Sequence, residues 1–440
     1  MNPGRLKWTS FWPAQKARTM LMLTLACFGV SCTTPPVKTE SAPTPAQRSN
    51  IKVDVRLGGP VIVTTTAAEF QILPSGHVQA SLLKGDQRLT LDESSGSSSD
   101  FLVHDGKEIP FALDLGQVRI RDSVGKLGRG KHLEIPSHPL DASVTNIQRT
   151  VLVEVYDDFP NMLLSSAEYR NTGKEDLHID RVVEQQRRLN ASLADAKAQP
   201  YDLWSFHGSS YDWGKDDVIK LSRTFSQPNL MGAEVKGGYG GGIPVVAFWT
   251  GSVGEAIGHV ETLPLTLSLP VKVDTDGKVN AGMDIAADAV LKPGEAYSTP
   301  RSFVEVYAGD FYEPLHDWSR VLQKEGWEIP KPSGEAYNVS WCGWGYEFNV
   351  TPAQMLGTVP KLKELNIKWA TLDDRWFDTY GDWNPRRDTF PGDSIKNMVD
   401  DFHKQGILVQ LWWLPLGAED GQGRWESHKY IVSKLSLIHI

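Results

Sequence analysis

Between residues 51 and 306 the hydrophobic positions recur with a period of two. Segments such as IKVDVRL, TVLVEVY and LPLTLSLPVKV alternate or run apolar over the length of a strand, and clusters such as PSGH and DTDGK separate them as turns. About 250 residues of short strands predict two packed antiparallel sheets rather than one open sheet. We therefore expect a large β domain over residues 51–306.

The period changes to that of a helix directly after this β segment. In FYEPLHDWSRVLQKEGW, the apolar residues Leu315, Trp318 and Leu322 fall on one helical face, and Gly326 is placed to end the helix. We expect a connecting helix and linker over residues 307–334.

Three strand-like segments then alternate with helix-like segments. The strands are YNVSWCGW, IKWATLDD and ILVQLWWLP, and the intervening helices are TPAQMLGTVPKLKEL and SIKNMVDDFHKQG. Gly357 and Pro360 predict a kink or a split in the first of these helices. The order strand, helix, strand, helix, strand is typical of right-handed βαβ units in a parallel sheet, where functional side chains gather at the carboxyl ends of the strands.

Carboxylates and tryptophans stand at those strand ends. Asp373 and Asp374 follow the second strand, Trp341 and Trp344 end the first, and Trp412 ends the third. Indole rings stack on the C–H faces of sugars, and carboxylates accept hydrogen bonds from vicinal hydroxyls. The combination indicates a neutral ligand that is rich in hydroxyl groups.

Structural explanations exist for several of these residues. Adjacent strand positions face opposite ways, so Trp369 and one of Trp412 and Trp413 are expected in the core. Two adjacent acids also occur as helix caps or in salt bridges. His207 and His259 lack the spacing of a metal site, so we expect each to be structural or on the surface. The Gly-rich segments SFHGSSYDWGKDD and KGGYGGGIP are either ordinary turns or loops that reach the sugar site, and the sequence favours neither.

The amino-terminal residues are typical of an export signal. Basic residues precede the apolar run MLMLTLACFGV, which is too short for an ordinary membrane span. We expect a signal peptide over residues 1–31 and a flexible linker over residues 32–50. Cys32, or alternatively Cys27, is a candidate for lipidation, and plain secretion is the alternative. The expected location is the bacterial periplasm or the cell surface.

Composition limits the classes of partner. The chain has a formal net charge of −9, with 22% charged and 40% hydrophobic residues, and it contains no basic block. This argues against electrostatic binding to nucleic acid and favours a neutral partner. No phosphate-binding loop or dinucleotide-binding fingerprint occurs in the sequence.

Several of these segments together resemble glycoside hydrolase family 36, the melibiase-type α-galactosidases and their raffinose-synthase relatives. The similarity is carried by SWCGWGYEFNVT, LKELNIKWATLDDRWFDTYGDWNP and FPGDSIKNMVDDFHKQGILVQLWW, and upstream by GGGIPVVAFWT, GEAIGHVETLPLTLSLPV and GDFYEPLHDWSRVL. It implies an N-terminal β-supersandwich followed by the first part of a (β/α)8 TIM-type barrel, with three βα units in residues 335–434. One departure is PLGAED after the third strand, where many members carry PE.

The resemblance also assigns roles at the strand ends. It implies that the two aspartates hold the hydroxyls of a galactose-like ring and that tryptophans form the walls of the pocket. The substrate-binding residues that it implies are Asp373, Asp374, Trp376, Trp383, Trp341, Trp344 and Trp412.

The implied reaction is a retaining double displacement without a metal or an organic cofactor. Such a reaction uses two carboxylates about 5–5.5 Å apart, and in family 36 these follow the fourth and sixth barrel strands. Residues 335–434 are expected to hold only the first three strands, so the resemblance assigns no catalytic residue among them. The 440-residue chain is therefore expected to lack hydrolase activity. The last six residues, LSLIHI (435–440), match a translation of a transposon sequencing adapter, and we expect adapter read-through there.

Two classes of function follow from the sequence. The first is an exported α-galactosidase-like hydrolase, with galactosyl transfer of the raffinose-synthase type, or action on another α-linked sugar, as alternatives. The second is a non-catalytic, carbohydrate-binding surface lipoprotein. The expected partners are α-galactoside oligosaccharides or polysaccharide side chains, and the resemblance adds self-association into a homo-oligomer.

Overall fold

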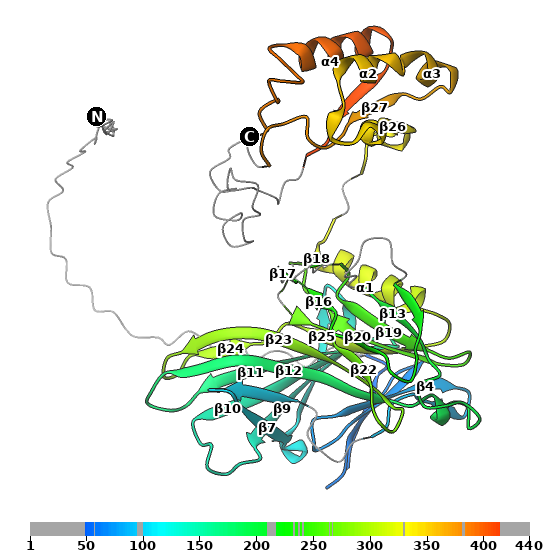
Figure 1. The fold of residues 1–440 in the computed structure, drawn as a ribbon. Coiled ribbons are helices and arrows are strands. Elements are labelled where there is room, and N and C mark those ends of the chain that lie inside the picture. Colours follow the sequence, from blue (N-terminus) through cyan, green and yellow to red (C-terminus); the bar gives the residue numbers. More distant parts are fainter. Residues whose placement is uncertain are drawn as a thin grey trace, which may run out of the picture. The chain divides into compact units, whose positions relative to one another are not determined.

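The computed structural model describes residues 49–413, first a β-rich part and then a part with a parallel sheet (Figure 1). Within this span it leaves out 57, 95–99, 209–216, 232–233, 236–237, 240–241, 264, 266, 329–330 and 381–382. The expected signal peptide, both candidate lipidation sites, much of the two Gly-rich segments and residues 435–440 lie outside the described residues. No helix among the described residues has the length and apolar character needed to cross a membrane.

The β-rich part begins with a five-stranded antiparallel sheet in the order β1-β2-β3-β4-β5. Its strands are β1 (Lys52–Val55), β2 (Val61–Thr64), β3 (Ala68–Ile72), β4 (Val78–Lys84) and β5 (Gln87–Leu89).

A larger antiparallel arrangement follows. Its strands are β6 (Phe101–His104), β7 (Lys107–Leu113), β8 (Arg119–Gly125), β9 (Gly128–Pro139), β10 (Ile147–Tyr156), β11 (Met162–Asn171), β12 (Leu177–Leu189), β13 (Trp204–His207), β14 (Val218–Lys220), β15 (Ser226–Gln227), β16 (Leu230–Met231), β19 (Val245–Trp249), β20 (Gly254–His259), β21 (Leu267–Ser268), β22 (Val271–Val273), β23 (Val279–Leu291), β24 (Ala296–Ser298) and β25 (Ser302–Tyr307). A separate hairpin consists of β17 (Glu234–Val235) and β18 (Gly238–Tyr239), and two 3-10 turns are Leu115–Gln117 and Ala191–Leu193.

The pairings form two groups of strands, one around β12 and β23 and one around β10 and β11, in agreement with the predicted two packed sheets. Because β7 pairs with a strand of each group, the pairings connect both groups into one closed arrangement. Long strands have different partners along their two edges, as β12 has β23 along one and, over Arg181–Val183, β6 along the other. Similarly, β11 pairs with β10 along one edge and with β24 and β25 along the other. The predicted β-rich character of this part is confirmed.

Strand β10 shows how the period-two pattern builds the core. Its inward positions are buried and its outward positions are more exposed, as expected for a sheet with one covered face. The inward residues are Ile147, Arg149, Val151, Val153 and Val155. The buried cation among them, Arg149, pairs with Asp100 at 2.8 Å, which offsets part of its desolvation.

Helix α1 (Tyr312–Glu325) lies beside β13, β19 and β20 (Figure 1) and packs its apolar face against them. Val321 and Leu322 are buried, and the indole of Trp318 donates a hydrogen bond of 2.9 Å to the carbonyl of His259. The helix ends at Gly326, whose φ of 110° places it in the left-handed region that favours glycine. The predicted helix is confirmed.

The second part contains a three-stranded parallel sheet in the order β26-β27-β28. Its strands are β26 (Ser340–Cys342), β27 (Trp369–Leu372) and β28 (Leu408–Leu411), and its α-helices are α2 (Pro352–Gly357), α3 (Val359–Glu364) and α4 (Ser394–Lys404). Two 3-10 segments, Gly334–Tyr337 and Gly343–Asn349, flank β26. The three α-helices lie together on one side of β26 and β27 (Figure 1).

The local sequence explains these elements. Thr351 and Gln354 form a capping box at the start of α2, and the predicted split between α2 and α3 falls at Thr358, two residues before Pro360. The core of this part combines residues of the sheet and of the helices, including Met355, Leu362, Ala370, Leu372, Met398 and Phe402. The expected parallel sheet is confirmed, whereas its continuation into a complete barrel and the domain boundaries stay predictions.

Candidate functional site

The carboxyl ends of the three parallel strands lie along one edge of the sheet. Cys342 pairs in register with Thr371, and Thr371 pairs with Gln410. The backbone amide of Trp412, the residue after β28, donates a hydrogen bond of 2.8 Å to the carbonyl of Leu372. The residues that follow the strands, including the aspartate pair after β27, therefore meet at this edge.

Asp373 is held by two donors. Its Oδ2 accepts a hydrogen bond from the Cys342 thiol, with an Sγ to Oδ2 distance of 2.9 Å. Its Oδ1 lies 2.7 Å from the backbone nitrogen of Asp374, which donates to it. Burial, together with the neighbouring Asp373 carboxylate, raises the pKa of the Cys342 thiol. The thiol therefore stays protonated at neutral pH and acts as a donor.

Asp374 is held in the same manner. Its Oδ1 accepts from the backbone amide of Arg375 at 2.7 Å, and its Oδ2 accepts from the hydroxyl of Tyr380. Arg375 has a φ of 65°, a left-handed conformation that is uncommon for a residue with a long side chain. Its guanidinium lies 4.5 Å from the centre of the Tyr380 ring. Strained backbone of this kind clusters at functional sites.

A cluster of aromatic rings, which we call the aromatic cluster, lies next to the pair. Phe377 is its centre, with ring centres at 4.5 Å from Trp383, 4.9 Å from Tyr380, 5.4 Å from Trp376 and 6.3 Å from Trp412. The indole nitrogen of Trp376 donates to the carbonyl of Trp412 at 2.8 Å. Trp376 is only 7% exposed and Phe377 is fully buried, so these two rings support the cluster from within.

The remaining predicted tryptophans differ in exposure. Trp341 is half-buried and packs edge-on against Tyr346, with ring centres 6.3 Å apart. Trp344 is 42% exposed, and its backbone amide donates to the Cys342 sulfur at 3.4 Å. Trp413, which was not among the predicted site residues, is 51% exposed and lies edge-on to Trp383 at 6.2 Å.

Comparison with known proteins gives two kinds of match, although no family model matches the chain. In sequence, the chain is 25% identical over 307 residues to an A type blood α-D-galactosamine galactosaminidase of Flavonifractor plautii, covering 66% of this chain and 26% of that protein. In fold, it is similar to a family 36 α-galactosidase of Geobacillus stearothermophilus, with a TM-score of 0.52 and 15% identity over 89% of this chain and 64% of that one.

A second solved structure agrees. The α-galactosidase of Lactobacillus brevis matches with a TM-score of 0.52 and 15% identity, over 83% of this chain and 56% of that one. The resemblance to glycoside hydrolase family 36 is confirmed. Variants of the Geobacillus enzyme have been solved in complex with raffinose and with stachyose.

The extent of the family 36 match limits what it establishes. The chain spans about a quarter of the curated galactosaminidase (26%) and 56–64% of these two solved enzymes. Structural similarity at 15% identity establishes the fold. The activity, substrates and partners of the whole protein are therefore treated as proposals.

Two functional contacts were missed from the sequence. Tyr380 lies in the segment DTYGDW between the predicted Asp374 and Trp383, yet nothing in the pattern indicated that its hydroxyl turns back to Asp374. Cys342 was not among the predicted site residues, although its place on the first strand, opposite the second, could have indicated a contact with the aspartate pair.

His207 and His259, the two histidines weighed as metal ligands, are both buried in the β-rich part. His207 is buried, and its ring nitrogens lie 2.9 Å from Ser205 Oγ and 2.8 Å from Asn229 Nδ2. Burial lowers the pKa of His207 to about 4 and that of His259 to about 4 as well. Among the described residues, no group of three or more His, Cys, Asp and Glu side chains is arranged to hold a metal ion.

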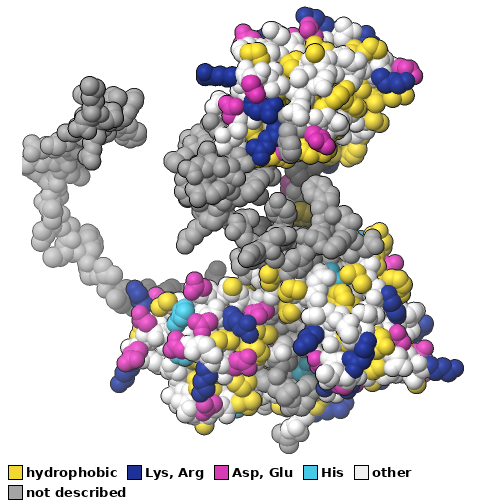
Figure 2. All heavy atoms as spheres, viewed as in Figure 1, with side chains coloured by type: hydrophobic (Ala, Val, Ile, Leu, Met, Phe, Trp, Pro, Cys, Tyr) yellow, Lys and Arg dark blue, Asp and Glu magenta, His cyan; other side chains and the backbone are white. Residues whose placement is uncertain are grey.

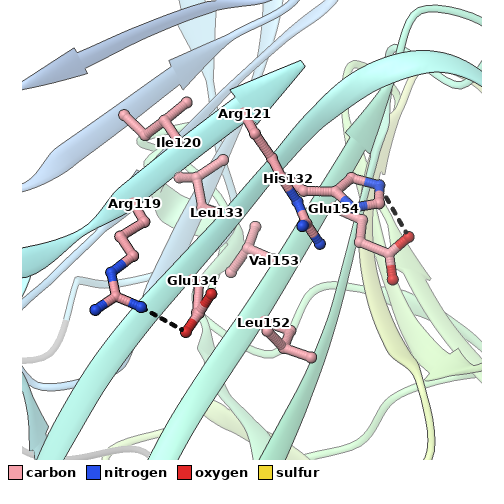
Figure 3. Close-up of a pocket in the computed structure, with 9 residues that line it drawn as sticks. All are labelled: Arg119, Ile120, Arg121, His132, Leu133, Glu134, Leu152, Val153 and Glu154. Carbon is pink, nitrogen blue, oxygen red and sulfur yellow. Dashed lines mark hydrogen bonds and ion pairs between the residues drawn. The ribbon is translucent and has the colours of Figure 1, made fainter. Parts of the chain in front are cut away.

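A surface groove of about 230 Å³ lies across β8, β9 and β10 (Figure 3). Arg119 forms an ion pair with Glu134 at 3.4 Å across neighbouring strands, and His132 lies 3.5 Å from Glu154 on the next strand. None of the predicted site residues lines it. Acidic and basic side chains are interspersed in the same way over the visible face of the β-rich part (Figure 2), which is typical of a solvated sheet surface.

Proposed function

We propose that the strand-end site binds an α-linked galactose-like sugar as part of an exported retaining glycoside hydrolase. The observation that carries the proposal is the aspartate pair, in which each carboxylate is oriented by two donors beside the aromatic cluster. Carboxylates held in this way accept hydrogen bonds from two hydroxyls of one ring, while exposed aromatic faces cover its C–H groups. Trp341, Trp344, Trp383 and Trp412 are the proposed walls, and Trp376 supports them.

We also propose that β26, β27 and β28 are the first three strands of a (β/α)8 barrel. Their parallel order, and the helices that connect them, support this architecture. In such a barrel the strand-end site opens at the carboxyl face, where barrel enzymes bind their substrates. The catalytic carboxylates of a family 36 enzyme would follow later strands, so we expect the chain to bind sugar without hydrolysing it.

An α-galactosaminide is a second candidate substrate. It is favoured by the sequence match to a galactosaminidase, because a protonated amine would form a charged hydrogen bond with one of the two carboxylates. Galactosyl transfer of the raffinose-synthase type has no observation of its own in its favour. A non-catalytic surface lipoprotein would share the same sugar site.

The test measures binding of methyl α-galactoside, methyl α-galactosaminide and methyl α-glucoside to the purified chain by titration calorimetry. We expect binding of a galacto-configured sugar, weakened about 10- to 100-fold in Asp373→Asn and in Asp374→Asn, because hydrogen bonds to charged groups contribute about 1.5–3 kcal/mol. Asp378→Asn is the matched control, since this neighbouring acid is exposed. Equal affinity for all three sugars, or unchanged affinity in both variants, contradicts the proposal.

Turnover is measured on the same samples with an aryl α-galactoside. Binding without turnover is the expected result, and release of the aryl group by this chain would refute the proposed absence of catalysis.

Export is proposed from the sequence alone. The basic and apolar segments of residues 1–31 and the cysteine at position 32 support cleavage and lipidation at the cell surface, with Cys27 as the alternative site. Mass spectrometry of the mature amino terminus tests this proposal. An unprocessed terminus with an unmodified Cys32 and Cys27 would exclude it.

A further inference from the structure

Two ionised carboxylates in adjacent positions repel one another and, when partly buried, need donors to fix their directions. Asp373 and Asp374 each accept hydrogen bonds from the same two kinds of donor. Each carboxylate takes one backbone amide, from the residue that follows it, and one side-chain donor from further away. The side-chain donors are Cys342 for Asp373 and Tyr380 for Asp374.

We propose that Cys342 and Tyr380 are positioning residues that set the directions of the two ligand-binding carboxylates. The inference rests on the proposed function and adds to it two residues that contact the aspartates rather than the sugar. In this arrangement one oxygen of each aspartate is fixed by a backbone amide and the other by a side chain. The remaining lone pairs are then aimed at the ligand.

Tyr380 is suited to this task because its ring cannot move freely. The side chain is 6% exposed and packs edge-on against Phe377, Trp383 and Trp412, with ring centres 4.9, 6.2 and 6.1 Å away. A buried hydroxyl requires a partner, and here its partner is Asp374 Oδ2. The packing of the aromatic cluster therefore determines where that carboxylate oxygen lies.

Cys342 is fixed by the sheet itself. Register with Thr371 holds its backbone on β26, and its sulfur accepts a hydrogen bond of 3.4 Å from the amide of Trp344 while the thiol donates to Asp373. A thiol is a weak donor compared with a phenol. Removing Tyr380's hydroxyl should therefore weaken ligand binding more than removing the thiol.

The test measures sugar affinity by titration calorimetry in Tyr380→Phe, Cys342→Ala and Cys342→Ser. We expect about a 10-fold loss in Tyr380→Phe and about a 3-fold loss in Cys342→Ala, in line with single hydrogen bonds. Cys342→Ser, which keeps a donor, should recover affinity. The thermal midpoint of each variant is recorded beside its affinity, because a general structural role would lower both together.

A second measurement needs no ligand. Because the Asp373 carboxylate helps to raise the pKa of the Cys342 thiol, Asp373→Asn should increase the rate at which iodoacetamide alkylates Cys342, followed by mass spectrometry of its peptide. An unchanged alkylation rate overturns the inference, and so does unchanged affinity in Tyr380→Phe and Cys342→Ala when the unaltered chain binds sugar. If the unaltered chain binds no sugar, the proposed function fails first and this inference fails with it.

Discussion

Glu184 offers a sharp test of how burial controls the stability of the β-rich part. It is 4% exposed on β12, and burial, together with the nearby Asp100 carboxylate, raises its pKa from 4.5 to about 8, against the opposing effect of Arg149. The folded state therefore retains a proton that the unfolded chain releases. Stability contributed by this group is complete below pH 4.5 and is lost as the pH rises through about 8.

The loss can be estimated from the difference in pKa. Relative to a neutral side chain of the same shape, ionisation of Glu184 in the unfolded state costs about 3 kcal/mol of stability at pH 7 and roughly 5 kcal/mol at pH 9. Glu184→Gln should match the unaltered protein at pH 4 and exceed it progressively at higher pH. Urea unfolding at pH 4, 7 and 9, followed by far-ultraviolet circular dichroism, measures this difference.

The control is Glu108→Gln on β7, an exposed glutamate whose replacement should leave the pH dependence of stability unchanged. Parallel curves of unfolding free energy against pH for Glu184→Gln and the unaltered protein would refute the reasoning. A Glu184→Gln variant that is less stable at every pH would refute it as well.

Two further predictions concern His207 in the β-rich part and the tryptophans near the aspartate pair. Burial lowers the pKa of His207 from 6.5 to about 4, so the stability of the folded protein should fall as the pH drops from 6.5 to about 4. The thermal midpoint of His207→Gln should depend less on pH over this range than that of the unaltered protein. An equal dependence in the two proteins would contradict the prediction. Beside the aromatic cluster, the exposed ring of Trp413 lies edge-on to the proposed wall residue Trp383 and extends that wall. Trp413→Ala should therefore weaken sugar binding several-fold at a nearly constant thermal midpoint, because the ring is 51% exposed. Trp376→Phe should instead lower the midpoint, because it loses the hydrogen bond to Trp412. Fluorescence titration measures sugar binding and thermal unfolding measures the midpoint in both variants. A lowered midpoint in Trp413→Ala together with weakened binding alone in Trp376→Phe would contradict the roles inferred from exposure.

Patterns confined to one segment were predictable from the sequence. The helix that ends at Gly326, the split before Pro360 and the parallel strands all follow from local periodicity and from the conformations of glycine and proline. Of the two tryptophans that follow β28, Trp412 is partly buried against the core and Trp413 is exposed, as expected for one of the pair.

Features that depend on distant segments were not predictable. Strand β11 pairs with β24 and β25, more than a hundred residues away, and no local pattern encodes that choice. Trp369 was expected in the core and is only half-buried. It stands at the amino end of β27, and its indole donates to the carbonyl of Glu335 at 2.9 Å. A tryptophan at a strand end has fewer neighbours to cover it than one in the middle.

The polar geometry of the candidate site is a product of the apolar packing beneath it. Phe377 is fully buried and contacts Trp383, Tyr380 and Trp412, so it fixes the ring whose hydroxyl orients Asp374. The direction of one carboxylate in the proposed sugar site therefore depends on Phe377 and Tyr380, which are buried beneath it. The phenol of Tyr380 links the aromatic cluster to the aspartate pair, so the aromatic residues that follow the pair, Trp376, Phe377 and Trp383, also bear on its geometry.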